Sequence, residues 1–160
     1  MASNALTWTV KWRAREVDWP TIVRRAIRAN AISYLNPPIK NFGVPGIRKA
    51  AALAPSWGEI IDDAPAQLAK MALLIEGGGT GGGLFRRMYR DFLSEANIHL
   101  KSDLIDEARE LVDQSSNGWT EASALLDHFK SDQTSLDSVA EIFSRNADLE
   151  EQAFGLLSQL

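Results

Sequence analysis

The stretch with the clearest capacity for chemistry is a glycine tract followed by arginines, EGGGTGGGLFRRMYRDF, at residues 76–92. A glycine-rich turn can surround an anion with backbone amides, and the start of a helix adds a partial positive charge. The tract therefore predicts either a turn that lets two helices fold back on each other, or an anion site. The turn alone is the simpler interpretation. The residues of the candidate anion site are Gly79, Thr80, Gly81, Gly82, Gly83, Arg86, Arg87 and Arg90.

Known nucleotide-binding motifs do not account for this tract. Gly77, Gly79 and Gly82 formally match the dinucleotide fingerprint, but that motif needs a strand before it and a second strand after it. The preceding MALLIE continues a helical pattern that starts at Pro65, and the sequence after the tract is polar and helical. A phosphate-binding Walker loop is excluded because no Gly-Lys-Ser/Thr follows the glycines.

No catalytic or metal-binding constellation is visible elsewhere. The chain has no cysteine, which excludes a thiol nucleophile, a disulfide and a cysteine-based zinc site within it. Its two histidines, His99 and His128, lack the spacing of metal ligands. The acidic pairs Asp62-Asp63 and Glu150-Glu151 are expected on solvated helix faces or ends. We expect no catalytic residue, no metal and no cofactor in this chain.

The composition is that of one soluble domain with a real core: 160 residues, 45% hydrophobic and 24% charged. No membrane-spanning run and no signal peptide are visible, so we expect a cytoplasmic protein without a membrane partner. The first fifty residues carry nine Lys or Arg and two Asp or Glu, whereas the last sixty carry four and thirteen. These regions can attract each other or face different partners. The chain is acidic as a whole, with net charge −4, so a nucleic-acid partner is not expected.

The sequence LTWTVKW at residues 6–12 alternates apolar and polar side chains, which is typical of a half-buried strand. No comparable second strand follows. We therefore expect an orphan strand of a missing N-terminal domain, or a strand that pairs with its copy in a homodimer. Residues 1–5 are interpreted as a cloning scar.

Residues 13–160 are predicted to form a compact helical domain, so the expected fold class is mainly α, with six to seven helices and one short N-terminal β-strand. The first helix begins at Pro20, carries Arg24, Arg25 and Arg28 on its polar face, and is stopped by Pro37-Pro38. Asn117-Gly118 is expected to break a later helix. The other expected helices begin near Pro45, at a capping box on Ser56, near Pro65, after the glycine tract at residue 84, at Ser102, near Trp119 and at Thr134.

Two segments, NPPIKNFGVPGIRKAA at 36–51 and GTGGGLFRRMYRDFLSEA at 79–96, resemble a known family. With WTEASALL at 119–126 and a glutamate-rich last helix, they are similar to the domain of unknown function that forms the C-terminal half of proteins similar to butirosin biosynthesis protein H. The resemblance covers the chain from about Asp18 onward, and the Gly-Thr-Gly-Gly-Gly-x-Phe-Arg-Arg-x-Tyr block is its most specific part. The positions that it adds to the candidate site are Asn41, Gly43 and Tyr89.

The resemblance implies an acyltransferase of secondary metabolism whose cysteine-bearing N-terminal half moves an acyl group from an acyl carrier protein to an amine. No catalytic residue transfers to this chain, because it has no cysteine. The implied role is a non-catalytic domain that shapes the acceptor or carrier site. An acidic carrier with a phosphopantetheine arm would dock on Arg24, Arg25 and Arg28. The alternative is an interaction module that dimerises through residues 6–12 and binds no small molecule.

Overall fold

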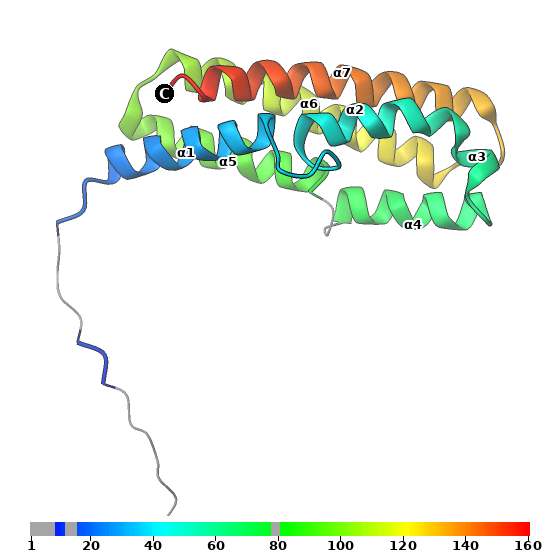
Figure 1. The fold of residues 1–160 in the computed structure, drawn as a ribbon, viewed down its shortest axis with the longest axis horizontal. Helices are drawn as coiled ribbons and strands as arrows, with labels where there is room; N and C mark the ends of the chain where they lie inside the picture. The colour runs from blue at the N-terminus through cyan, green and yellow to red at the C-terminus, as the bar shows by residue number, and fades with distance from the viewer. Residues whose placement is uncertain (1–8, 12–15, 78–80) are drawn as a thin grey trace, which may run out of the picture.

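The computed structural model describes residues 9–11, 16–77 and 81–160, and every regular element in these ranges is helical (Figure 1). The mainly α class predicted from the sequence is confirmed. None of the helices in these ranges is long and apolar enough to cross a membrane. The elements are α1 (Trp19–Leu35), α2 (Gly43–Leu53), the 3₁₀-helix η1 (Ala54–Ser56), α3 (Trp57–Ile60), α4 (Ala64–Gly77), α5 (Gly83–Leu100), α6 (Asp103–Asp127) and α7 (Gln133–Leu157).

The architecture is a four-rod bundle in which two rods are split. The long helices α6 and α7 pack against each other along the centre of the molecule (Figure 1). The helices α1 and α2 follow one another along α7, and α4 and α5 follow one another along α6 (Figure 1). We call these the α1–α2 rod and the α4–α5 rod. Each is interrupted near the middle of the bundle, the first at residues 36–42 and the second at the glycine tract (Figure 1).

The helix ends follow local chemistry. Asp18 caps α1 by accepting a hydrogen bond from the Thr21 amide at 3.2 Å, and Pro20 occupies the first turn. The helix ends at Leu35, before Pro37-Pro38, as predicted. At the start of α7 the cap is Asp132, which accepts from the Thr134 amide at 3.2 Å. The predicted start of this helix is therefore confirmed to within a residue, but an acid provides the cap.

The predicted strand at residues 6–12 is wrong. Residues 9–11 are described and belong to no strand, and Val10 is 74% exposed; residues 6–8 and 12 lie outside the described residues. A strand needs a neighbouring edge for its backbone hydrogen bonds. In the part of the chain that the structure describes, all regular elements are helices and offer no such edge. Alternation gives a segment two different faces but does not supply a partner.

The predicted break at Asn117-Gly118 is also wrong, because α6 runs through both residues. A Cβ atom on Gly118 would lie 2.2 Å from Oδ1 of Asn146 on α7. The glycine is therefore needed for the close approach of the two central helices. A helix-interior glycine costs about 1 kcal/mol relative to alanine, which the packing of α6 on α7 outweighs.

The capping box expected at Ser56 is absent. The Ser56 hydroxyl donates to the Leu53 carbonyl at 2.8 Å, back into the preceding turn, and makes no cap bond to α3. The short helix α3 nevertheless starts at Trp57, where its indole is buried in the core. Tertiary packing, rather than the cap, holds this turn.

The apolar core has two parts, one on each side of the rod interruptions. The first lies between α2, α4 and the adjoining halves of α6 and α7, and the second between α1, α5 and the other halves. On α6 the two parts are separated by Ser115 and Ser116. On α7 they are separated by Glu150, and Asn146 lies at the end of the first part; all four polar residues are buried. The middle of the bundle therefore contains a layer of buried polar side chains, at the level where both rods are split.

Candidate functional site

The centre of the candidate site is the carboxylate of Glu150 on α7, which is fully buried. Its Oε1 accepts hydrogen bonds from Ser115 Oγ at 2.5 Å, Trp119 Nε1 at 2.8 Å and Arg86 Nε at 2.9 Å. Its Oε2 accepts from Arg86 Nη2 at 2.7 Å and from the Tyr34 hydroxyl. Five hydrogen bonds from donors on α1, α5 and α6 thus satisfy one buried acid.

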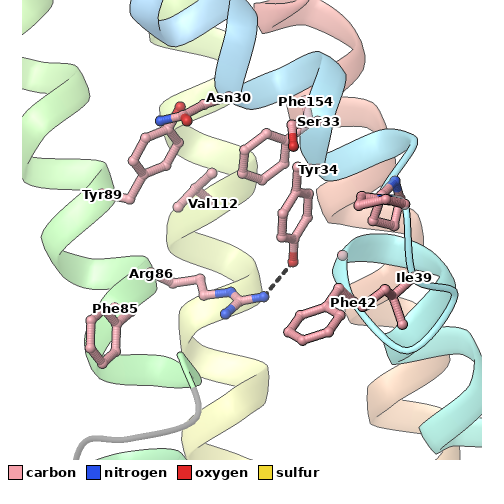
Figure 2. A pocket seen from close by; sticks show the side chains of 13 residues that line it. Asn30, Ser33, Tyr34, Ile39, Phe42, Phe85, Arg86, Tyr89, Val112 and Phe154 are labelled. Carbon is pink, nitrogen blue, oxygen red and sulfur yellow. Dashed lines mark hydrogen bonds between the residues drawn. The ribbon is translucent and has the colours of Figure 1, made fainter.

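Arg86, in the first turns of α5, carries the opposite charge. Besides its two bonds to Glu150, it donates from Nη2 to the Tyr34 hydroxyl oxygen at 2.6 Å (Figure 2). Its guanidinium carbon lies 5.1 Å from the Trp119 ring centroid and 5.9 Å from the Tyr34 ring centroid. Arg86, a residue of the candidate anion site, thus contacts an acid of its own chain, Glu150.

The protonation states follow from these contacts. Burial raises the pKa of Glu150, but Arg86 and the hydrogen-bond donors outweigh burial and hold that pKa below its usual range. Burial lowers the pKa of Arg86, and the neighbouring carboxylate more than restores it. Burial and the Glu150 charge raise the pKa of Tyr34. At neutral pH the group is therefore a carboxylate, a guanidinium and a phenol. It has no net charge, and every oxygen of the carboxylate is occupied.

A cavity of about 640 Å³ opens above this network, between α1 and α5 (Figure 2). We call it the α1–α5 cavity. The Arg86–Tyr34 hydrogen bond lies at its base, and Arg86 is the one charged residue in its wall (Figure 2). Its aromatic walls are formed by Tyr34, Phe42, Phe85, Tyr89 and Phe154, with Pro37, Pro38, Ile39 and Val112 beside them and Asn30 and Ser33 on α1.

A second cavity, of about 510 Å³, lies between α2 and the start of the α4–α5 joint. We call it the α2–α4 cavity. The two cavities share Tyr34, Phe42, Gly43 and Arg86 as lining residues, so they adjoin. Their boundary coincides with the interruptions of both split rods. Described residues at both interruptions line the cavities, among them Pro38 and Phe42 at the first and Gly81 and Gly82 at the second.

Several residues of the predicted anion site do line these hollows. Gly81 and Gly82 line the α2–α4 cavity, whereas Gly79 and Thr80 lie outside the described residues. Gly81 has φ +78°, and Gly82 and Gly83 are buried, so the described end of the tract is packed. Gly82 comes close to α4, since a Cβ there would lie 2.5 Å from the Ile75 carbonyl oxygen.

The three positions that the resemblance added are distributed over both cavities. Asn41 lines the α2–α4 cavity, Tyr89 lines the α1–α5 cavity and Gly43 lines both. The Asn41 side chain accepts a hydrogen bond from Lys49 Nζ at 2.9 Å. The Tyr89 hydroxyl is buried without a hydrogen-bond partner among the described residues, and burial raises its pKa to about 12. These contacts assign no binding role to any of the three.

Arg87 and Arg90 line neither cavity. Arg87 pairs with Glu76 at the end of α4 and donates to Thr120 Oγ1 at 3.1 Å. Arg90 pairs with Asp91 and Asp113 at 2.8 and 2.6 Å. These two arginines therefore join α5 to its neighbours. Binding of an external anion by the tract stays a prediction.

Arg24, Arg25 and Arg28 are exposed on α1. Within the described ranges none of them forms an ion pair, and none lines either of the two cavities above. In these ranges, therefore, the three arginines do not form ion pairs with the acidic C-terminal helices of their own domain. The charge on this flank of α1 remains available to a partner.

Sequence reasoning missed the central residue. Glu150 was grouped with Glu151 as a solvated acidic pair, yet only Glu151 is exposed. The signal was present in the helical spacing of α7, because Phe143, Ala147 and Glu150 follow one another at intervals of four and three residues on its buried stripe. Tyr34, Ser115 and Trp119 were not predicted either, since their roles depend on contacts between distant helices.

The described residues contain no group of three or more histidines, cysteines or acids that could hold a metal ion. Comparison with protein families shows that the model of a domain of unknown function, DUF4872, matches residues 1–157. Comparison with curated proteins gave no match, and comparison with solved structures gave none.

Proposed function

The chain belongs to the DUF4872 family, and we propose that it is the non-catalytic helical domain of a cysteine-dependent acyltransferase of secondary metabolism. The link to proteins similar to butirosin biosynthesis protein H, which the sequence segments suggested, is part of this proposal. In it, the domain shapes the site for the amine acceptor or for the acyl-bearing phosphopantetheine arm of a carrier protein. The observation that carries the proposal is an apolar cavity built over an internally neutralised ion pair.

Such a cavity is suited to binding rather than to bond making. A volume of about 640 Å³ is typical of small-molecule sites. A general base needs a free lone pair in reach of the substrate, but the Glu150 oxygens are occupied by five donors. The chain has no cysteine, and neither histidine lines the α1–α5 cavity or the α2–α4 cavity. The nucleophile would come from another domain.

The exposed arginines of α1 support the carrier part of the proposal. Arg24, Arg25 and Arg28 have no internal ion-pair partner among the described residues, so they can steer an acidic carrier protein toward the domain. They lie away from both cavities, which lets the carrier dock on one flank while its arm, or the acceptor, occupies the hollow.

The test compares acyl transfer from a carrier to an amine by three proteins. They are this chain alone, the chain preceded by a cysteine-bearing domain, and that longer protein with its cysteine replaced by alanine. Transfer by the second protein only is the expected result. Transfer by this chain alone, or by the cysteine variant, would contradict the proposal.

A second candidate function is that of an interaction module without a ligand. One observation favours it: α5 exposes Phe85, Met88 and Phe92, at 46%, 58% and 39%, on neighbouring turns. Met88 lines neither cavity, so Met88→Glu probes this face separately. Sedimentation that shows a dimer for the unmodified chain and a monomer for the variant, with unchanged circular dichroism, would favour this candidate.

A further inference from the structure

We infer that the α1–α5 cavity binds an uncharged, predominantly apolar molecule with one hydrogen-bond acceptor, such as a carbonyl oxygen, which takes a hydrogen bond from Arg86 at the boundary of the two cavities. The inference rests on the proposed function, because it gives the ligand chemistry of the same site. Of the two occupants proposed there, it selects the uncharged acyl group of the carrier's arm over the amine acceptor, which is a cation at neutral pH. It concerns the 160-residue chain itself and is tested without any acyl transfer.

The apolar part of the ligand follows from the cavity wall. The rings of Tyr34 and Phe154 stack with centroids 4.2 Å apart, and those of Phe154 and Tyr89 with centroids 5.6 Å apart. These stacked rings form one continuous aromatic wall (Figure 2). Phe42 and Phe85 also line the cavity and are 62% and 46% exposed. A flat ring or an acyl chain would cover this apolar surface and remove it from water.

The absence of charge on the ligand follows from the ion pair beneath it. Arg86 is the one charged side chain of the cavity wall, and its charge is balanced by Glu150 at 2.7 Å. An anion that enters would lose its hydration without gaining an uncompensated positive charge, and a cation would meet the guanidinium. A neutral molecule avoids both penalties.

The single acceptor follows from the unused donors of Arg86. Nε and Nη2 donate to Glu150 and Tyr34, whereas Nη1 has no hydrogen bond to any described residue. Nη1 lies 3.6 Å from where a Cβ of Gly81 would be; Gly81 lines the α2–α4 cavity, and Arg86 itself lines both cavities. A carbonyl oxygen there would satisfy a donor to which the described residues offer no acceptor.

The experiment uses three probes of nearly the same shape: 2-acetylnaphthalene, 2-ethylnaphthalene and 2-naphthoate. Each is titrated into the ¹⁵N-labelled chain and followed by amide chemical shifts. We expect 2-acetylnaphthalene to bind roughly three- to tenfold more tightly than 2-ethylnaphthalene, the effect of one hydrogen bond. We expect 2-naphthoate to bind no more tightly than the ketone.

Ser33→Trp places a large side chain in the cavity and leaves both residues of the ion pair unsubstituted, and it should weaken both neutral probes by about tenfold or more. The matched control is Ala29→Trp, at an exposed position of the same helix that lines neither cavity. It should leave both affinities unchanged. Arg86→Lys should abolish the preference for the ketone over the hydrocarbon. If this variant does not fold, the inference is still tested by the relative affinities of the three probes and by the comparison of Ser33→Trp with Ala29→Trp.

Three results would overturn the inference: no probe binding more tightly than about 1 mM, equal weakening by Ser33→Trp and Ala29→Trp, or clearly tighter binding of the naphthoate. Failure here is distinguishable from failure of the proposed function. Acyl transfer without probe binding would mean that the domain contributes by carrier docking alone. Probe binding without acyl transfer would keep the ligand site and remove the acyltransferase.

Discussion

At the scale of single residues, Glu150 decides the chemistry of the bundle centre. An unpaired carboxylate at this depth would be strongly disfavoured, and the five donors around it compensate for its lost hydration. Removing its charge leaves Arg86 as a half-satisfied cation in a largely apolar setting. Breaking a buried pair on one side is among the more destabilising changes that a protein can undergo.

Glu150→Gln is therefore expected to lower the free energy of unfolding by about 3–5 kcal/mol. Equilibrium unfolding in urea, followed by circular dichroism, measures the change. Glu151→Gln is the matched control, because Glu151 is exposed and pairs with Arg48 on the surface. Its loss should be within about 1 kcal/mol. Equal effects of the two substitutions would show that the buried network contributes no more than a surface pair.

Because of the same carboxylate, we expect the stability of the chain to fall at acidic pH. The folded-state pKa of Glu150 is below its unfolded value, so its contribution is complete above the unfolded pKa of about 4.3 and is lost as the pH falls toward the folded pKa. The unmodified chain should lose stability more steeply than Glu150→Gln below about pH 4.3. Urea midpoints measured from about pH 7 to about pH 3 test this, and parallel curves for the two proteins would contradict it.

At the scale of elements, the α6–α7 contact depends on Gly118. Alanine would place its Cβ 2.2 Å from Asn146 Oδ1, so Gly118→Ala should destabilise the chain by about 1–3 kcal/mol through overpacking. Gly155 also lies within a central helix, but a Cβ there would meet nothing within 4 Å, so Gly155→Ala should stabilise by about 0.5–1 kcal/mol. Opposite signs in thermal unfolding are the expected outcome; a stabilising Gly118→Ala would mean that the helices can separate at little cost.

The joint between α4 and α5 gives a second comparison of two glycines. Gly82→Ala would bring a Cβ to 2.5 Å from the Ile75 carbonyl oxygen, which is backbone and cannot turn aside. At Gly83 the nearest atom is Oε2 of the Glu76 side chain at 2.8 Å, which can move. Gly82→Ala should therefore cost about 1–3 kcal/mol and clearly more than Gly83→Ala. Chemical denaturation ranks the pair, and the reverse order would show that the tract acts only as a tether.

At the scale of the whole molecule, we expect the positive flank of α1 to affect carrier binding and the buried polar layer to affect stability, each without the other. Reversing both Arg24 and Arg28 to Glu should leave the unfolding free energy within about 1 kcal/mol, because both are exposed. The same double variant should bind an acidic acyl carrier protein more weakly, most visibly at low salt. Calorimetric titration at two salt concentrations measures this.

The control for that prediction is Arg48→Glu, which reverses an exposed arginine that pairs with Asp148 and Glu151 on α7. It should leave carrier binding unchanged while lowering stability slightly. If the Arg24 and Arg28 variant unfolds, or if Arg48→Glu weakens carrier binding equally, the α1 flank is not a docking surface.

Local chemistry along the chain determined most of the helices. The Asp18 cap, Pro20, Pro37-Pro38 and the apolar periodicity act within a few residues, so the bounds of α1, α4 and α5 could be predicted closely. The lack of a cysteine likewise excludes a thiol nucleophile without any structure. Prediction failed where the outcome depended on a neighbouring element. A strand at residues 6–12 would need a sheet to pair with, and the predicted break at Gly118 did not take into account the helix that packs against it.

Only the tertiary structure decided the site. Tyr34 and Glu150 are 116 positions apart, and their contact exists because α1 packs on α7. The cavities are lined by residues of α1, α2, α5, α6 and α7, which no local pattern brings together. Packing also decided the roles of the arginines that follow the glycine tract. Arg86 pairs with the buried Glu150, whereas Arg87 and Arg90 pair with acids nearer the surface. The burial of a charge depends on which helices surround it, and that is a property of packing rather than of spacing.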